Sequence, residues 1–263
     1  MPKNNPTENV HLRFCKDLLG VQRQTTNIGV LLELGEIPIS IYAKKQCIKN
    51  FSRIHTQNAN RILLATMGNP ANSNGVWHNV VKNCLDKLGL GGLDTDVIHK
   101  KVLERMKDIF YQEAFLNINR ADSKLRTFAK LKTSIGMEKY LITCLNLKHR
   151  TAITKLRLSN HDLCIEMGRH SGIDKSKRYC PFCPNLIETE KHFLLQCTVF
   201  DTLRMNYLTF ELQPLNFNLE FLADNEKFIY LLTEESALQH VGIFLHKAFQ
   251  LRKYLCEKHK NHS

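Results

Sequence analysis

RYCPFCPNLIETEKHFLLQC, residues 178–197, is the part of the chain in which residues converge on one defined chemistry. Cys180 and Cys183 are separated by two residues. His192 follows after eight more residues, and Cys197 after a further four. Zinc prefers four tetrahedral thiolate and imidazole ligands, and a CxxC turn followed by a short helix can supply them. The spacing therefore predicts a closed Cys3His zinc module.

The expected ligand set leaves no coordination position for water or substrate. A catalytic zinc normally keeps one such position, so the sequence predicts a structural zinc ion. Three thiolates around one Zn²⁺ carry a net charge of about −1. The nearby cations that can offset it are Lys175, Lys177, Arg178 and Lys191. Glu188 and Glu190 are interpreted as acids at the start of the ligand-bearing helix.

A rival ligand pair lies just upstream, because His161 and Cys164 form an HxxC pattern. This pair could replace His192 and Cys197 as metal ligands. The simpler interpretation is that His161 ends a helix and that Cys164 packs as a small apolar residue.

The composition indicates a basic protein with enough apolar residues for a core. The chain has 263 residues, 43% of them hydrophobic, and 37 Lys and Arg against 25 Asp and Glu, which gives a net charge of +12 and a pI near 9.3. This balance predicts an acidic partner such as RNA, DNA or an anionic surface.

The sequence contains no targeting or membrane signal that we can identify. The opening MPKNNPTENV is polar, and no apolar run approaches the ~20 residues of a membrane helix. We therefore expect an intracellular protein, in the nucleus or cytoplasm, with no membrane partner. The nine cysteines are then expected to be reduced thiols and metal ligands.

Helical periodicity dominates the chain, and almost no alternating strand pattern occurs. Gly35 is expected to stop one helix and Pro38 to open the next. A last long helix carries Leu238, Val241, Leu245, Ala248 and Leu251, and can either close the core or bind a partner. The predicted fold is mostly α, a multi-helix assembly with the zinc knuckle inserted before a C-terminal helical segment.

The glycines at 89, 91 and 92 mark the best domain boundary. The expected segments are an N-terminal helical region (1–92), a basic helical region (93–178), the zinc module (179–199) and a C-terminal helical segment (200–263).

Positive charge is concentrated between Arg120 and Arg178, with fourteen Lys or Arg against five Asp or Glu. Leu145, Ala152, Ile153 and Leu156 form an apolar stripe, and cations flank it on both sides. The residues expected to contact nucleic acid are Lys148, Arg150, Lys155, Arg157, Arg169, Lys175, Lys177 and Arg178. The alternative is that these cations only solvate a helix.

No motif for catalysis is found. The chain has no GxxxxGK loop, GxSxG elbow or HExxH helix. Asp94 and Asp96 are interpreted as helix caps. We therefore expect a protein that is not an enzyme.

Three segments resemble the tail of reverse transcriptases from non-LTR (LINE-like) retrotransposons. They are LRLSNHDLCIEMGRH (156–170), RYCPFC (178–183) and ETEKHFLLQC (188–197), followed by Arg204. The opening HLRFCKDLLGVQRQTTNIGVLLELGEIP (11–38) is similar to the segment after the polymerase palm in such elements. The resemblance implies a zinc-binding tail that grips RNA or DNA. The family's paired palm aspartates are absent, because no Asp-Asp occurs in the chain, and no clear nuclease pattern follows Cys197.

Two functions remain open at this point. One is a nucleic-acid-binding, zinc-containing tail of a retroelement reverse transcriptase without the polymerase site. The other is a zinc-stapled helical scaffold that binds an acidic protein.

Overall fold

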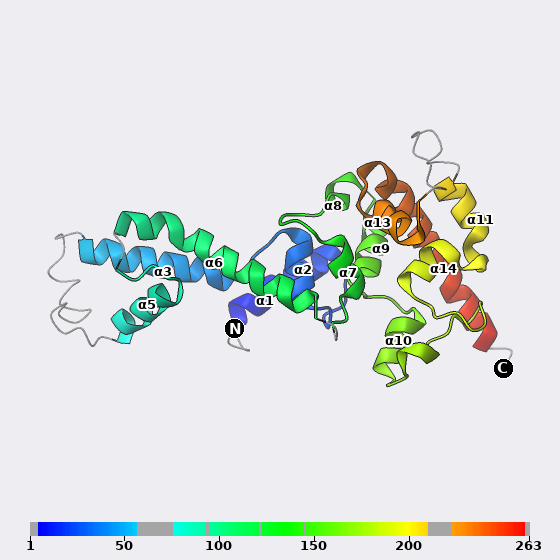
Figure 1. Cartoon of the computed structure of the whole chain (residues 1–263), viewed down its shortest axis with the longest axis horizontal. Helices are drawn as coiled ribbons and strands as arrows, with labels where there is room; N and C mark the ends of the chain where they lie inside the picture. The colour runs from blue at the N-terminus through cyan, green and yellow to red at the C-terminus, as the bar shows by residue number, and fades with distance from the viewer. Residues whose placement is uncertain are drawn as a thin grey trace. The chain divides into compact units, whose positions relative to one another are not determined.

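The computed structural model describes residues 5–56, 76–92, 95–120, 123–144, 146–209 and 222–260 (Figure 1). The helices are α1 (Pro6–Leu19), α2 (Asn27–Leu34), α3 (Ile39–Thr56), α5 (Val76–Lys87), α6 (Thr95–Ile118), α7 (Arg126–Leu131), α8 (Tyr140–Thr143), α9 (Leu147–Arg157), α10 (Cys164–His170), η1 (Lys175–Lys177), η2 (His192–Gln196), η3 (Thr198–Phe200), α11 (Asp201–Arg204), η4 (Met205–Thr209), α13 (Asp224–Thr233) and α14 (Glu235–Lys260). Over these ranges the only extended pairing is two isolated bridges, Leu34–Met137 and Tyr179–Ile187. The mostly α fold class is confirmed.

The chain forms two compact units. The first comprises Met1–His11 and Ile37–Leu116, and the second comprises Leu12–Glu36 and Asn117–Ser263. The glycine break that ends at Gly92 lies between α5 and α6, inside the first unit. The segment with the predicted ligand residues, 180–197, shares the second unit with α9 and α14.

In the first unit, α3 packs against α5. The Glu8 carboxylate accepts hydrogen bonds from the backbone N–H groups of Ile39 and Ser40, at 3.3 and 3.0 Å. A carboxylate at a helix start satisfies free N–H groups and complements the helix dipole. Pro38 directly precedes this start, as the sequence predicts. The expected cap at Asp94 lies outside the described residues.

Gly35 ends α2 in the left-handed conformation, with φ 69°, and its N–H bonds to the carbonyls of Leu31 and Leu32. The predicted glycine stop is confirmed. A Cβ at Gly35 would lie 2.4 Å from the backbone nitrogen of Met137. The glycine thus permits the close approach at which the Glu138 N–H bonds to the Glu33 carbonyl at 3.0 Å.

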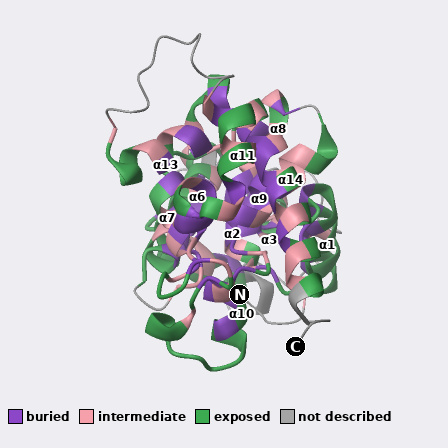
Figure 2. Cartoon of the chain, turned by 90° about the vertical axis from the view of Figure 1, so that its right-hand side faces the viewer, coloured by how far each residue is buried: buried purple, intermediate pink, exposed green. Residues whose placement is uncertain are grey.

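The core of the second unit is built around α14, which packs on α8, α9, α11, α13 and η4. The predicted apolar positions of α14 up to Ala248 are at most 1% exposed, whereas Leu251 is half-buried. On α9, Ala152, Ile153 and Leu156 are buried as expected, and Leu145 lies outside the described residues. Figure 2 shows buried positions gathered on α9 and α14. The last long helix therefore closes the core.

Arg157 corrects one expectation, because it points into this core and not toward solvent. Its side chain is 0% exposed. Its Nε donates to Glu33 Oε1 at 2.6 Å, and its Nη2 donates to Glu138 Oε2 at 2.6 Å. The Tyr140 hydroxyl also donates to Glu33, at 2.6 Å. At the inner edge of α9, the burial of an arginine charge is tolerated because the charge is paired with two carboxylates.

Candidate metal centre

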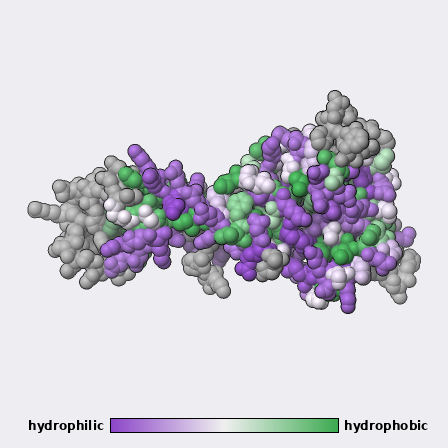
Figure 3. Space-filling model, in the orientation of Figure 1, coloured by the Kyte–Doolittle hydropathy of each residue, from purple (hydrophilic) through white to green (hydrophobic). Residues whose placement is uncertain are grey.

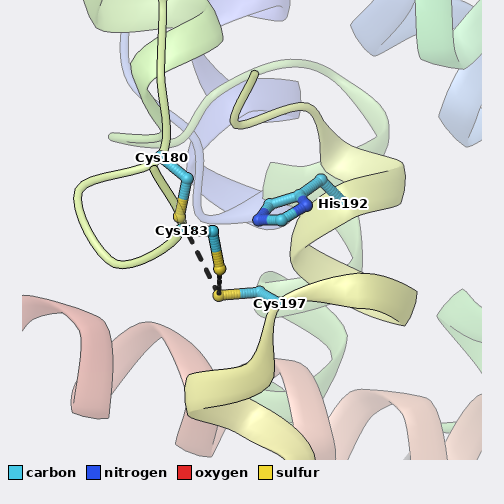
Figure 4. Close-up of side chains that lie close together, drawn as sticks. All are labelled: Cys180, Cys183, His192 and Cys197. Atoms are coloured by element: carbon cyan, nitrogen blue, oxygen red, sulfur yellow. Dashed lines mark hydrogen bonds between the residues drawn. The ribbon is translucent and has the colours of Figure 1, made fainter. Parts of the chain in front are cut away.

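A short hairpin presents the two cysteines of the CxxC pattern. The Cys180 N–H donates to the Leu186 carbonyl at 2.7 Å, and the Leu186 N–H donates to the Cys183 carbonyl at 3.3 Å. Asn185 adopts a positive φ of 64° at the turn, a conformation that asparagine tolerates better than most residues. These bonds place both thiols on the inner side of the hairpin (Figure 4).

The other two ligand residues lie at either end of η2, which is a single π-helical turn. Thr189 Oγ1 accepts the N–H of His192 at 3.0 Å and so fixes the start of the turn. The Cys197 N–H donates to the His192 carbonyl at 2.8 Å and closes it. The predicted short helix is therefore present in a wider form, and the turn brings His192 and Cys197 to the same side.

The four ligand atoms converge. One ligand atom each from Cys180, Cys183, His192 and Cys197 lie within 4.8 Å of one another, and all four residues are buried (Figure 4). The Sγ of Cys197 lies 3.9 Å from that of Cys180 and 3.7 Å from that of Cys183. With Zn–S bonds of about 2.3 Å, the edge of a tetrahedron of sulfurs is about 3.8 Å. The group has the dimensions of a tetrahedral thiolate site.

Two further features show that a metal ion fits this group. His192 Nε2 is buried and has no hydrogen-bond partner, so the ring has a nitrogen ready to act as a ligand. The pKa of Cys180 is lowered, mainly because the Cys197 thiol donates a hydrogen bond to its sulfur, with a smaller effect from the nearby His192 ring. The same pairing raises the pKa of Cys197. A metal cation held by these residues would replace the shared protons and stabilise all three thiolates.

The rival ligand pair does not join the group. His161 Nε2 lies 3.2 Å from Glu190 Oε1, and Cys164 lies beside Arg252, with Sγ–Nη2 at 3.8 Å. Burial, followed by the charge of Glu188, raises the pKa of Cys164 to about 12, so its thiol stays protonated at neutral pH. Cys164 therefore lies outside the ligand set, beside the Arg252–Glu188 pair.

Glu188 is not a helix-start acid as the sequence suggests, and the structure corrects this interpretation. It is 0% exposed. Its carboxylate accepts from Nε and Nη2 of Arg252 on α14, both at 2.7 Å, and from the Cys164 N–H at 2.5 Å. The bidentate pair connects the segment that carries the four ligand residues (the metal group) to α14. Bidentate arginine–carboxylate pairs are both strong and geometrically specific.

Glu190 begins the helical turn, as the sequence predicts, but its carboxylate is also paired inside the unit. It is 2% exposed and accepts from Arg126 Nη2 on α7 at 2.5 Å, while Nη1 of the same arginine donates to Glu166 on α10 at 2.5 Å. The His161 hydrogen bond and charge and the Arg126 charge lower the pKa of Glu190 to about 2, against the opposing effect of burial. Sequence reasoning misses both Arg126 and Arg252. The only available signal is Glu-Thr-Glu between ligand residues, which does not name the partners.

The cations expected to contact nucleic acid fall into two groups. Lys148, Arg169, Lys175 and Lys177 are exposed, although Arg169 also pairs with Glu166 at 3.1 Å. Lys155 is half-buried. Of these five residues only Lys148 and Lys155 lie on α9, so the set does not form one row of cations along that helix.

The remaining arginines of that set bind backbone carbonyls or carboxylates. Arg150 is half-buried and donates to the Leu141 carbonyl at 3.2 Å. Arg178 is half-buried, and its guanidinium donates to the carbonyls of Ile165 and Ile173 at 2.7 and 2.9 Å. With the buried Arg157, these residues serve the fold, so the expectation that both edges of α9 offer free cations is wrong at Arg157.

No protein-family model, curated protein or solved structure matches the chain. A search of the described helices for one long and apolar enough to cross a membrane finds none.

Proposed function

We propose that the protein is a nucleic-acid-binding module with a structural zinc ion, of the kind that follows the polymerase in LINE-like reverse transcriptases. The zinc assignment is supported by the donor set, because three thiolates and one imidazole in a closed tetrahedral group are typical of structural zinc. The ion would be held by Cys180, Cys183, His192 and Cys197, and it would fix the hairpin to η2. All four ligands are protein atoms, which leaves no coordination position for water or substrate. The ion would therefore support a binding surface and not take part in catalysis.

The observation that carries the nucleic-acid proposal is an unequal exposure of charges around the metal group. Between Cys164 and Cys197 the acids are Glu166, Asp174, Glu188 and Glu190, and all except Asp174 are buried in pairs with arginine. Arg126 and Arg252, which supply the charge, come from outside the segment. The segment's own Arg169, Lys175 and Lys177 stay exposed. Its surface is therefore cationic, which favours phosphate.

An exposed aromatic residue adds a surface for bases. Tyr179 is 47% exposed and Leu186 is 51% exposed, both on the hairpin that carries the CxxC pattern. Figure 3 shows small apolar patches within a mostly hydrophilic face of the second unit. Aromatic side chains among lysines are the usual platform for single-stranded nucleic acid, because bases stack while cations meet the phosphates. We therefore propose single-stranded RNA or DNA as the ligand.

The test is a titration with single-stranded and duplex oligonucleotides at several salt concentrations. Removing one phosphate contact reduces the slope of log affinity against log salt by about 0.7 for a single strand. Lys175→Gln with Lys177→Gln should flatten the slope by about 1.4. Lys44→Gln with Lys49→Gln, exposed positions on α3, is the control with an equal change of net charge and should leave the slope unchanged.

Tyr179→Ala separates stacking from charge. It should weaken single-strand binding by about 1–3 kcal/mol without changing the salt slope. Lack of binding by the parent protein at physiological salt would reject the proposal and favour the scaffold that binds an acidic protein. The proposal also holds that the chain alone does not extend a primer, and incorporation above a heat-inactivated control would overturn that part.

A further inference from the structure

Two histidines face each other where α9 meets α14. The ring centroids of His149 and His246 are 5.7 Å apart, and the ring planes make an angle of 54°. Gly242 lies one helical turn before His246, and a Cβ there would be 2.9 Å from the Cβ of His149. Residues four apart share a helix face, so the glycine lets α9 approach closely at the point where the two rings meet. Helix packing therefore sets the spacing of the histidines.

Each histidine has a lysine as its chain neighbour. Lys148 and Lys247 are exposed, and Lys247 Nζ lies 5.4 Å from the centre of the Tyr207 ring on η4. Burial, then Lys247 and Lys148, lower the pKa of His149. Burial, then His149 and the same two lysines, lower the pKa of His246. We call these four residues (Lys148, His149, His246 and Lys247) the histidine–lysine cluster.

Among the described residues, no ion pair joins a carboxylate to a cluster residue, and no acid contributes to the pKa shift of either histidine. The neighbouring helices α8, α11, α13 and η4 offer few acids, and each acid of α11 and α13 has another partner. Asp201 pairs with Arg204, Asp224 accepts from Gln196 and Glu226 accepts from the Ala223 N–H. At the start of α14, Glu235 accepts from Thr143. Of the remaining neighbours, α8 has no charged side chain and Arg150 turns to a carbonyl. On α7, Arg126 is paired with Glu166 and Glu190, and the other charged residue is the cation Lys130.

This charge distribution favours an anionic ligand over a cationic one. Two imidazoles alone could bind a metal cation, but the flanking ammonium groups repel it and no anionic ligand completes the site. An anion instead relieves the mutual repulsion of four cationic side chains. Lysine and protonated histidine are donors only, and their hydrogen bonds to phosphate oxygens are charge-assisted.

We infer that the histidine–lysine cluster is a second contact for the phosphates of bound nucleic acid, strengthened when its histidines are protonated. The inference rests on the proposed function, since it assumes that nucleic acid is the ligand. It extends the binding surface from the metal group to the junction of α9 and α14, within the same unit.

The pH dependence has a definite sign. The lowered pKa of each histidine favours its neutral imidazole near pH 7 when no ligand is bound. As the pH falls, each ring gains a proton and a second donor, and bound phosphate favours this form. Binding therefore takes up protons, and the affinity and salt slope both rise as the pH falls.

The experiment measures binding of a short single-stranded RNA at about pH 5.5 and about pH 8, which bracket histidine titration. The parent slope of log affinity against log salt should steepen by up to about 1.4 at the lower pH, since two added charges each contribute about 0.7. His149→Gln with His246→Gln should lose most of this steepening. His240→Gln, on the same helix and outside the cluster, is the matched control and should retain it.

Two outcomes overturn the inference. A double variant with the same pH-dependent change of slope as the parent removes the cluster from the binding surface while leaving the proposed function intact. If the parent binds no oligonucleotide at either pH, the proposed function fails and the inference fails with it. Ring NMR signals of the two histidines provide an independent readout. Their apparent pKa should rise when RNA is added, and an unchanged titration in RNA-bound protein contradicts phosphate contact.

Discussion

The second unit contains two buried polar centres that are assembled in opposite ways. The metal group takes its four side chains from 18 consecutive residues, 180–197. The Arg157 centre joins residues that are 124 positions apart at Glu33 and 19 apart at Glu138. The first is a ligand set defined by local spacing, and the second exists only after the helices have packed. From this difference we predict that loss of the metal destabilises only the segment around the ligand residues. Loss of Arg157 should instead lower the stability of the whole second unit.

Removal of the metal should cause the greatest loss of folding free energy. Structural zinc contributes about 10–16 kcal/mol of apparent binding free energy in small zinc modules, because binding and local folding are coupled. A chelator should raise hydrogen exchange in residues 178–200, while α3 and α6 of the first unit keep their protection. Metal analysis should find one ion per chain, and Cys183→Ser should lose it.

The control for this experiment is Cys84→Ser, a partly buried cysteine on α5 outside the ligand set. It should retain the ion. Cobalt substitution gives the spectroscopic readout, because thiolate-to-cobalt absorption reports the number of sulfur ligands. A Cys183→Ser protein with the parent's full thiolate bands contradicts the ligand assignment.

The next effect in size is expected at Arg157. Arg157→Met removes the charge but keeps a long side chain, and it leaves Glu33 and Glu138 without their arginine. Breaking a buried ion pair from one side costs about 3–5 kcal/mol. Urea unfolding followed by hydrogen exchange in α9 and α14 should show the loss across the second unit. Lys155→Gln, half-buried on the same helix, should change stability by less than about 0.5 kcal/mol.

The Arg157→Met protein should also depend on pH in a specific direction. Burial already raises the pKa of Glu33 against the opposing effect of Arg157. Without the arginine, that pKa rises further, so the folded state holds a proton that the unfolded state releases. The variant should then regain stability as the pH falls toward the ordinary glutamate pKa of about 4.3. Adding Glu33→Gln should restore part of the loss at neutral pH, and a double variant as unstable as Arg157→Met alone would contradict the pairing.

The sequence predicts those features whose partners lie nearby in the chain. The Cys180–Cys197 spacing, the Gly35 helix stop and the apolar face of α14 all follow from local rules of geometry and periodicity. The fold class and the ligand group were therefore predictable. The same local rules place Arg157 outside, because it borders the apolar stripe of α9 at an angle that also suits a solvated cation.

Long-range ion pairs could not be predicted in this way. Glu188 and Glu190 look like acids at a helix start, yet they bind Arg252 and Arg126, each 64 residues away. Nothing in the local pattern names an arginine on another helix as the partner. The balance of charge on the surface around Lys175 and Lys177 depends in turn on these acids being buried and paired. Local spacing could therefore supply the metal group but not the charge distribution around it.

A smaller loss of stability is expected when a local interaction is removed from α9, the helix that carries Arg157. Asn146 caps α9, and its side chain accepts the Lys148 N–H at 2.9 Å. Losing such a cap costs about 1 kcal/mol, because a helix N–H group is left without its partner. Asn146→Ala should lower the urea midpoint by a corresponding small amount, whereas Asn146→Ser keeps an accepting oxygen and should stay close to the parent. If Asn146→Ala cost as much as Arg157→Met, the stability of α9 would depend on its local start more than on its buried ion pair, and the contrast between the two centres would fail.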